Sequence, residues 1–215
     1  MKSVLVSLKP YYYYLVGEGI KKIEVRKNMP RASDWNKEVL FYMSKDVKSF
    51  AKIPKEFQEK YREHFGEVGM QFVCDRIEEF YCASVPYQRE NNLGYGRFVD
   101  NGVYKVNGWH EGVVFERNDR YIDTMLKNKE LDEMCLSAQE IFDYIGIGKY
   151  LYGWHISDLV IYDKPKPIMQ FYKTCPIKLG FKNCPVCELY STYTGCCMNN
   201  IDRPPQSWVY VDELE

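Results

Sequence analysis

Three charged residues near the N-terminus have a spacing that suits the binding of a polar ligand. Lys21, Glu24 and Arg26 follow Gly19 in a Gly-x-Lys-x-x-Glu-x-Arg run. Glu24 and Arg26 are two residues apart, so they share one face of an extended strand, and Lys21 at the preceding turn can close over the same place. The two cations would hold a phosphate or a base edge, while the carboxylate would accept from an exocyclic amine or orient the arginine. A solvated ladder of surface charges is the simpler alternative.

A second group suited to chemistry lies in the C-terminal third, where five cysteines occupy a turn-rich segment. Cys184 and Cys187 form a Cys-x-x-Cys turn, which can place two thiolates on one zinc ion. Cys196 would be the third ligand, and Cys175 is preferred to Cys197 as the fourth. Such a zinc would be structural, because four cysteines leave no open position for catalysis. Buried inert thiols or a redox pair are the alternatives.

The elements that must position the charged residues can be read from the alternation of apolar and polar side chains. Residues 3–9 alternate and predict a strand with at least one buried face. Pro10 ends this strand and can begin a helix over the aromatic residues 11–16, which Gly17 and Gly19 stop. Ile23 and Val25 then face one side of a second strand, and the charged residues face the other.

The middle of the chain predicts further strands and helices. Residues 38–44 and 69–83 read as strands. In the charged segment 50–65, Phe57, Tyr61 and Phe65 follow Pro54 at four-residue spacing, which predicts one face of an amphipathic helix, with His64 on the surface at its end. Glycines punctuate residues 84–116, which predict two or three short strands with Trp109 and His110 in a loop. Residues 117–134 read as helical, and Ser137 to Glu140 form a capping box for another helix that Gly146 ends.

Three segments resemble the ASCH domains, a branch of the PUA-like barrel superfamily. The run from Ser3 to Arg26 is similar to the N-terminal signature of that family. Residues 152–165, with their Trp-His-Ile-Ser-Asp core, resemble its penultimate strand, and residues 203–211 resemble its closing strand. The resemblance implies an α+β fold: a small mixed β-barrel with flanking helices. It implies a single domain over residues 1–215, with insertions at about 84–134 and about 173–202.

The same resemblance implies a location for the charged residues and a possible reaction. Lys21, Glu24 and Arg26 would face a cleft between the barrel and the helices. One small branch of the superfamily hydrolyses acetylated cytidine with a lysine, a threonine and a glutamate. Lys21 matches the lysine and Glu78 or Glu79 the glutamate, but Glu24 stands at the threonine's position. Negligible release of acetate from N4-acetylcytidine is therefore expected, because a carboxylate does not replace a hydroxyl nucleophile.

The charge distribution favours a phosphate-bearing partner. The net charge is −1, yet residues 1–62 hold 14 Lys or Arg against 7 Asp or Glu, a net of +7, and residues 63–145 hold 8 against 16, a net of −8. A basic segment with interleaved tyrosines is typical of RNA-binding surfaces, although the two faces could also neutralise each other within one fold. The residues expected to bind RNA or a modified nucleotide are Lys9, Tyr11, Tyr12, Lys21, Glu24, Arg26 and Trp154.

Two other functions remain open at this point. The first is a hydrolase on modified nucleosides or RNA, including a ribonuclease, that uses the same cleft with Lys21 and Glu24 as its catalytic candidates. The second is a protein-interaction module of phage or mobile-element origin, whose insertion at 84–116 docks a host protein. RNA binding, turnover of nucleosides and a large exposed apolar patch would distinguish the three.

Composition excludes disorder and indicates the compartment. Aromatic residues make up 16% of the chain, with 19 tyrosines, as in folded sheet-rich proteins. No apolar run is long enough to span a bilayer, and Lys9-Pro10 cuts the first one short of a signal peptide. We therefore expect a cytoplasmic protein in a reducing environment, without a membrane partner. In such a setting Cys74, Cys82 and Cys135 are expected to be core residues.

Overall fold

A computed structural model describes residues 3–30, 37–83, 88–91, 94–97, 102–107, 121–125, 128–146, 149–174 and 201–213. The chain divides into two compact units. The first unit comprises Met1–Ile20, Pro30–Asp75 and Ile156–Glu215, and the second comprises Lys21–Met29 and Arg76–His155. Two long strands, β4 (Val68–Ala83) and β9 (Tyr150–Lys166), contribute residues to both units.

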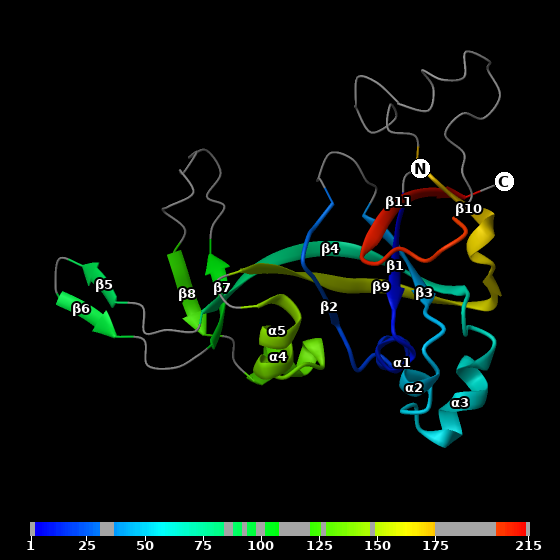
Figure 1. The fold of residues 1–215 in the computed structure, drawn as a ribbon, viewed down its shortest axis with the longest axis horizontal. Helices are drawn as coiled ribbons and strands as arrows, with labels where there is room; N and C mark the ends of the chain where they lie inside the picture. Colours follow the sequence, from blue (N-terminus) through cyan, green and yellow to red (C-terminus); the bar gives the residue numbers. More distant parts are fainter. Residues whose placement is uncertain are drawn as a thin grey trace, which may run out of the picture. The chain divides into compact units, whose positions relative to one another are not determined.

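The first unit contains a mixed sheet whose central strand is β1 (Figure 1). The N-terminal strand β1 pairs in parallel with β3 and antiparallel with β11. Beyond β11 the sheet continues with β10, and beyond β3 it continues with the first part of β4. Val4, Leu5 and Val6 of β1 are fully buried and Leu8 is 4% exposed, which confirms the strand predicted from their alternation. The bounds are β1 (Ser3–Leu8), β3 (Glu38–Met43), β10 (Phe171–Lys173) and β11 (Trp208–Glu213).

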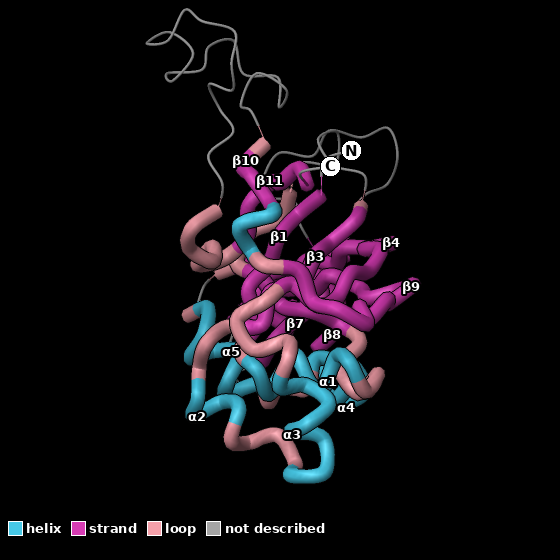
Figure 2. Tube along the Cα trace, turned by 90° about the vertical axis from the view of Figure 1, so that its right-hand side faces the viewer, coloured by secondary structure: helices cyan, strands magenta, loops and turns pink. Residues whose placement is uncertain are grey.

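The helices of the first unit begin where local sequence signals place them. Pro10 occupies the first turn of α1 (Pro10–Gly17), and the Asp46 carboxylate accepts a hydrogen bond from the Ser49 N–H at 3.0 Å to cap α2 (Val47–Phe50). Pro54 precedes α3 (Lys55–Arg62). These three helices gather at one end of the strands of this unit (Figure 2). A short 3₁₀ helix, η1 (Ile168–Gln170), leads into β10.

The helix predicted behind Pro54 is confirmed as α3, but it ends at Arg62, so that Phe65 lies beyond it. The structure has two separate helices, α2 and α3, and the chain from Ala51 to Pro54 is not helical. Pro54 separates the two helices, because a proline lacks an N–H and clashes with the preceding turn inside a helix.

His64 is buried, contrary to the surface position predicted for it. Only 6% of its surface is exposed, and its Nδ1 lies 2.9 Å from the Tyr13 hydroxyl. Because α3 ends at Arg62, the chain turns inward before β4 and carries the imidazole under α1. Burial lowers the pKa of His64 and raises the pKa of Tyr13 well above its ordinary value. Both groups are therefore neutral, and they share one hydrogen bond.

This burial predicts a loss of stability in mild acid. The folded pKa of His64 lies below its ordinary value of about 6.5, so the unfolded chain binds the proton first as the pH falls. The stabilisation is present above that value and is lost as the pH falls towards the lowered pKa. Urea unfolding at about pH 7.5 and about pH 5.5 measures the effect. The difference between the two should be smaller in His64→Gln, and an equal difference in both proteins would contradict the assignment.

The second unit combines strand pairs with two helices. The later part of β4 pairs with β7, β7 pairs with β8, and β2 pairs with β9, all antiparallel (Figure 1). The strands β5 and β6 form a separate hairpin. The bounds are β2 (Ile23–Arg26), β5 (Gln88–Asn91), β6 (Gly94–Arg97), β7 (Gly102–Asn107), β8 (Tyr121–Met125), α4 (Asn128–Met134) and α5 (Ala138–Ile145). The predicted short strands after residue 84 are confirmed, while Trp109 and His110 lie outside the described residues.

The apolar face of β2 packs with the helices of this unit. Ser137 and Glu140 form the predicted capping box: the Glu140 N–H donates to Ser137 Oγ at 3.2 Å, and the Ser137 N–H donates to Glu140 Oε2 at 2.8 Å. The helix that starts there brings Ile141 and Ile145 into one buried cluster with residues of the strands and of α4. The other buried members are Ile23, Val25, Phe80, Cys82, Met134 and Leu151.

The helix predicted over residues 117–134 is wrong in its first part. Residues 121–125 form β8, and among the described residues of this range the helix begins only at Asn128. Ile122 of this segment pairs with Val106 of β7. A short Tyr-Ile-Asp-Thr-Met segment is rich in β-branched and aromatic residues, and an available strand edge decides its structure.

The fold class is α+β, as predicted. A mixed sheet that includes the parallel pair of β1 with β3 is accompanied by helices that do not alternate regularly with the strands. Among the residues that the structure describes, no helix combines the length and the apolar character needed to cross a membrane.

Candidate functional site

Strand β2 places Glu24 and Arg26 side by side in the second unit. The strand pairs antiparallel with β9, so that Glu24 lies opposite Trp154 and Arg26 lies opposite Tyr152. Opposed residues of an antiparallel pair point to the same face, so these four side chains share one side of the strand pair. Lys22 lies just before β2 and donates its backbone N–H to the Glu133 carbonyl at 2.8 Å. This hydrogen bond fixes the start of the strand beside α4.

The structure brings the three predicted charged residues into one ion-pair cluster. Arg26 Nη2 lies 2.8 Å from Glu24 Oε1, and Lys21 Nζ lies 3.5 Å from Glu24 Oε2. Lys21 Nζ also donates to the Met134 carbonyl at 2.6 Å. The single carboxylate is therefore shared by two cations, and a backbone carbonyl of α4 holds the ammonium in place. We call Lys21, Glu24 and Arg26 the charged cluster.

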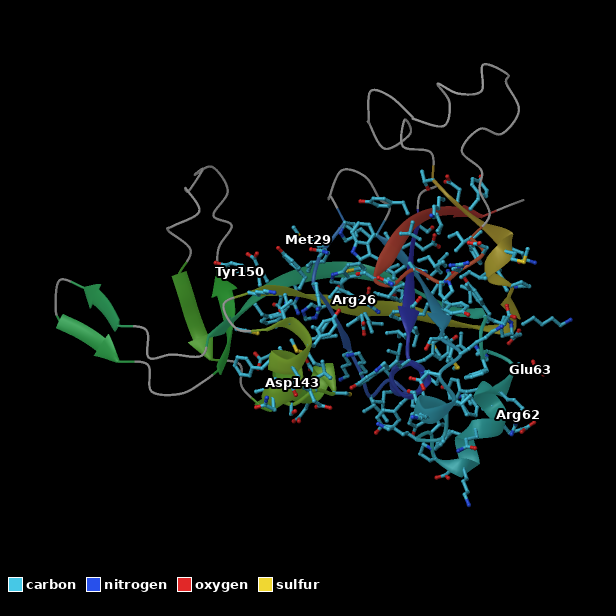
Figure 3. The ribbon with its side chains drawn as sticks, viewed as in Figure 1. Arg26, Met29, Arg62, Glu63, Asp143 and Tyr150 are labelled. Atoms are coloured by element: carbon cyan, nitrogen blue, oxygen red, sulfur yellow. The ribbon has the colours of Figure 1, made fainter. Side chains whose placement is uncertain are left out.

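The charged cluster is buried rather than solvated. The exposed fractions are 3% for Lys21, 5% for Glu24 and 6% for Arg26, and Figure 3 shows Arg26 among packed side chains. Both faces of β2 are thus covered, which excludes the simple ladder of surface charges. Charges are removed from water in a folded protein only where partners compensate them, so the cluster is a costly feature of the fold.

Burial changes the acid–base chemistry of Lys21. Desolvation lowers its pKa, and the nearby Glu24 carboxylate only partly offsets this effect. Cys135 lies close enough to influence the same ammonium, and burial raises the pKa of its thiol. A lysine with a lowered pKa releases its proton more readily than a surface lysine and can then accept one.

The polar face continues from the charged cluster to β4. The Tyr152 hydroxyl donates to Glu79 Oε1 at 3.2 Å, whereas Glu78 contacts His155 at 2.9 Å. Since Tyr152 is opposite Arg26, Glu79 lies on the cluster's side, and Glu78 lies on the other. Trp154 completes the face with a fully buried indole. A base can stack on that ring only after the packing around it opens.

Sequence reasoning missed Tyr144 and Lys27 at the edge of this site. The Lys27 ammonium lies 4.7 Å from the centre of the Tyr144 ring, and Tyr144 keeps 40% of its surface exposed. Burial of its hydroxyl raises the Tyr144 pKa, and both Arg26 and Glu24 act on it. The ring therefore lies within electrostatic reach of the charged cluster. Only the packing of α5 with β2 brings these residues together, and no local pattern indicates it.

The other predicted ligand-binding residues belong to the first unit. Lys9 is exposed, and Tyr11 and Tyr12 are half-buried with their ring centres 5.9 Å apart. The Tyr11 N–H donates to Ser49 Oγ at 3.1 Å. These three residues thus form a local group around the start of α1, distinct from the charged cluster of the second unit.

The predicted zinc ligands Cys175, Cys184, Cys187 and Cys196, and the alternative Cys197, lie outside the described residues. Within the described part of the chain, no group of three or more His, Cys, Asp or Glu side chains could hold a metal ion. Of the cysteines there, Cys74 and Cys82 are buried as predicted, while Cys135 is half-buried. The zinc site stays a prediction.

Comparisons with known proteins find similarity to solved structures at low sequence identity. No family profile matches the chain, and no curated protein matches it in sequence. A crystal structure of ASCH from Zymomonas mobilis is similar to 99% of this chain and 98% of its own, with 13% identity and a TM-score of 0.40. Two single-substitution variants of that protein are also similar, each with a TM-score of 0.41. One variant has 15% identity over 97% of this chain and 87% of its own. The other variant has 13% identity over 98% of this chain and 90% of its own.

Proposed function

We propose that this chain is an ASCH-type, PUA-like protein that binds RNA or a modified nucleotide through the charged cluster. The observation that carries the proposal is the convergence of Lys21 and Arg26 on Glu24 opposite Trp154. Two cations, one carboxylate and an indole are the groups that hold a phosphate, an exocyclic amine and a base. The family assignment rests on the sequence resemblance of residues 3–26, 152–165 and 203–211.

The roles within the cluster follow from the donors and acceptors present. Arg26 has a planar guanidinium whose fork of N–H donors matches a phosphate or a base edge, and it would bind such a group with two of them. Glu24 would accept from an exocyclic amine while keeping Arg26 oriented. Lys21 would supply a second positive charge. Binding in such a desolvated place makes each charge-assisted hydrogen bond stronger than at the surface.

The exposed edge of the cluster provides the first contact. Tyr144 and Lys27 offer an aromatic face and a cation to solvent, whereas the three cluster residues are almost closed off. A nucleotide would therefore stack on Tyr144 first and then reach Arg26 as the packing opens. This order makes single-stranded or looped RNA the favoured ligand, since its bases are free to stack.

Hydrolysis of a modified nucleoside or of RNA at the same place is the second candidate function. One observation favours it: burial lowers the pKa of Lys21, so that its amine could act as a general base on a water molecule. Against it, the chain has Glu24 where the related amidohydrolases have a hydroxyl nucleophile. RNA recovered intact after incubation would indicate binding alone.

Titration of the protein with a mixed-sequence, single-stranded RNA tests the proposal. We expect binding that weakens with salt, because each phosphate contact releases counterions. Two phosphate contacts would reduce the affinity roughly sevenfold between about 50 and about 200 mM salt. Double-stranded RNA of the same length should bind more weakly. No binding, or binding that does not respond to salt, would refute the proposal.

A further inference from the structure

A second polar group lies on the opposite face of β9 from the charged cluster. His155 is the register partner of Ile23, whereas its neighbour Trp154 is the partner of Glu24, and successive residues of a strand point to opposite faces. His155 Nε2 lies 2.9 Å from Glu78 Oε2, and His155 Nδ1 lies 3.0 Å from Arg76 Nη2. Arg76 Nη1 is also 3.5 Å from Glu78 Oε1. The nucleotide-binding proposal uses none of these three residues.

These contacts fix the state of the imidazole. A guanidinium has donors only, so the Nδ1 that faces Arg76 must accept. The carboxylate of Glu78 is an acceptor, so the Nε2 that faces it must carry the hydrogen. His155 is therefore the neutral Nε2–H tautomer, and Glu78 holds the ring in one orientation, as carboxylates do for histidines at many functional sites.

Exposure gives this group an open side and a closed side. The Glu78 and His155 side chains are only 10% and 15% exposed, whereas the Arg76 side chain is 61% exposed. A ligand can therefore arrive at the guanidinium, and the Nδ1 acceptor lies directly behind it. Both β4 and β9 are long strands, so all three residues of this group are held on rigid elements.

We propose that Arg76 and His155, oriented by Glu78, bind a hydrogen phosphate group, either free or at the end of a monoester. The anionic oxygens accept from the guanidinium, which exchanges a neutral imidazole partner for a charged one. The phosphate O–H donates to Nδ1, which Arg76 vacates by a rotation of its exposed side chain. No proton is transferred, and His155 keeps its neutral tautomer.

The site offers one acceptor, His155 Nδ1, and the N–H donors of Arg76, and this combination distinguishes between similar anions. Inorganic phosphate retains an O–H at neutral pH, and a monoester retains one below its second pKa of about 6. Sulfate and a phosphodiester have no such hydrogen, so their oxygens would face the lone pair of Nδ1 without a donor. An unpaired acceptor at a largely buried position costs binding free energy. Selectivity for phosphate over sulfate is the chemical signature of the site.

Proton-detected nitrogen-15 NMR of the histidine rings in the full chain tests the proposal. The apo spectrum should show the neutral Nε2–H tautomer for His155. Inorganic phosphate should shift its Nδ1 resonance saturably at neutral pH, while sulfate and dimethyl phosphate should not. Methyl phosphate at about pH 6 distinguishes the two sources: a shift assigns a site that admits monoesters, and its absence assigns free phosphate. The buried His64 of the first unit serves as an internal reference.

Two arginine variants make the test specific. Arg76→Gln should weaken phosphate binding about tenfold or more, because a charge-assisted contact is lost. Arg62→Gln is the matched control: Arg62 lies at the end of α3 (Figure 3), its side chain is 63% exposed, and it pairs with Glu59 at 2.9 Å. That variant should bind phosphate like the wild type. The proposal is overturned if phosphate leaves His155 unshifted, if sulfate shifts it equally, or if Arg76→Gln binds as well as the wild type. Because the site lies apart from the charged cluster, RNA binding can fail without affecting this result.

Discussion

Replacing Glu24 with glutamine is expected to reduce the free energy of unfolding by about 3–5 kcal/mol, the usual cost of breaking a buried ion pair from one side. The carboxylate is the shared counter-ion of Lys21 and Arg26, at 3.5 Å and 2.8 Å. Glutamine has nearly the same shape but no charge, so two cations would remain in a place with little water. Urea unfolding followed by circular dichroism measures the loss.

Variants of Lys21 show whether charge is the cause. In Lys21→Met the Arg26–Glu24 pair remains, while the contact with Glu24 at 3.5 Å and the hydrogen bond to the Met134 carbonyl are lost, so we expect a cost of about 1–3 kcal/mol, less than for Glu24→Gln. The double variant Lys21→Met/Glu24→Gln holds one buried cation instead of two. It should be more stable than Glu24→Gln alone. A double variant that loses the sum of both single effects would show that the cluster does not act through charge.

Replacing Gly69 with alanine should reduce stability by about 2–5 kcal/mol. A Cβ at this position of β4 would lie 2.0 Å from His64 Nδ1 and 2.5 Å from the Tyr13 hydroxyl. Both neighbours are buried ring groups that hydrogen-bond to each other at 2.9 Å. The methyl group therefore has to displace the strand or break the bond, and the estimate combines overpacking with a lost buried hydrogen bond.

A second substitution, His64→Ala, creates space beside Gly69 and provides the control for Gly69→Ala. In a His64→Ala background the nearest of these atoms is gone, so Gly69→Ala should cost much less than in the wild type. Thermal unfolding of the four proteins gives this comparison. Equal costs of Gly69→Ala in both backgrounds would mean that the contact with His64 does not decide the effect.

Local sequence patterns predicted most of the strands, and they predicted the start of helices that begin with a proline or a capping box. Alternation predicted β1 and β2, Pro10 marked the start of α1, and the Ser137–Glu140 capping box marked α5. The patterns failed where tertiary contacts decide. Residues 121–125 became a strand because β7 offers a partner, and His64 is buried because β4 and α1 enclose it. Neither contact leaves a trace in the neighbouring sequence.

The sequence predicted which charged residues of the candidate site lie together, but it did not predict their burial. Alternation placed Glu24 and Arg26 on one face, and the position of Lys21 at the turn brought it to the same carboxylate. The pattern did not reveal that the cluster is buried, because burial depends on contacts with residues that follow far along the chain. The contacts of Lys21 with the Met134 carbonyl and of Lys27 with Tyr144 depend on α4 and α5. Spacing within a strand is local information, whereas burial is not.

The affinity of RNA for Arg26→Lys tests the central claim most directly. Lysine keeps a cation beside Glu24 but loses the planar set of donors, so the fold should survive while two-point recognition is lost. We expect RNA binding to weaken by about 1–3 kcal/mol. Lys55→Ala, which removes an exposed cation of α3, should change it by far less. Salt-sensitive RNA binding that is equal in the wild type and in a folded Arg26→Lys variant would contradict the proposed site.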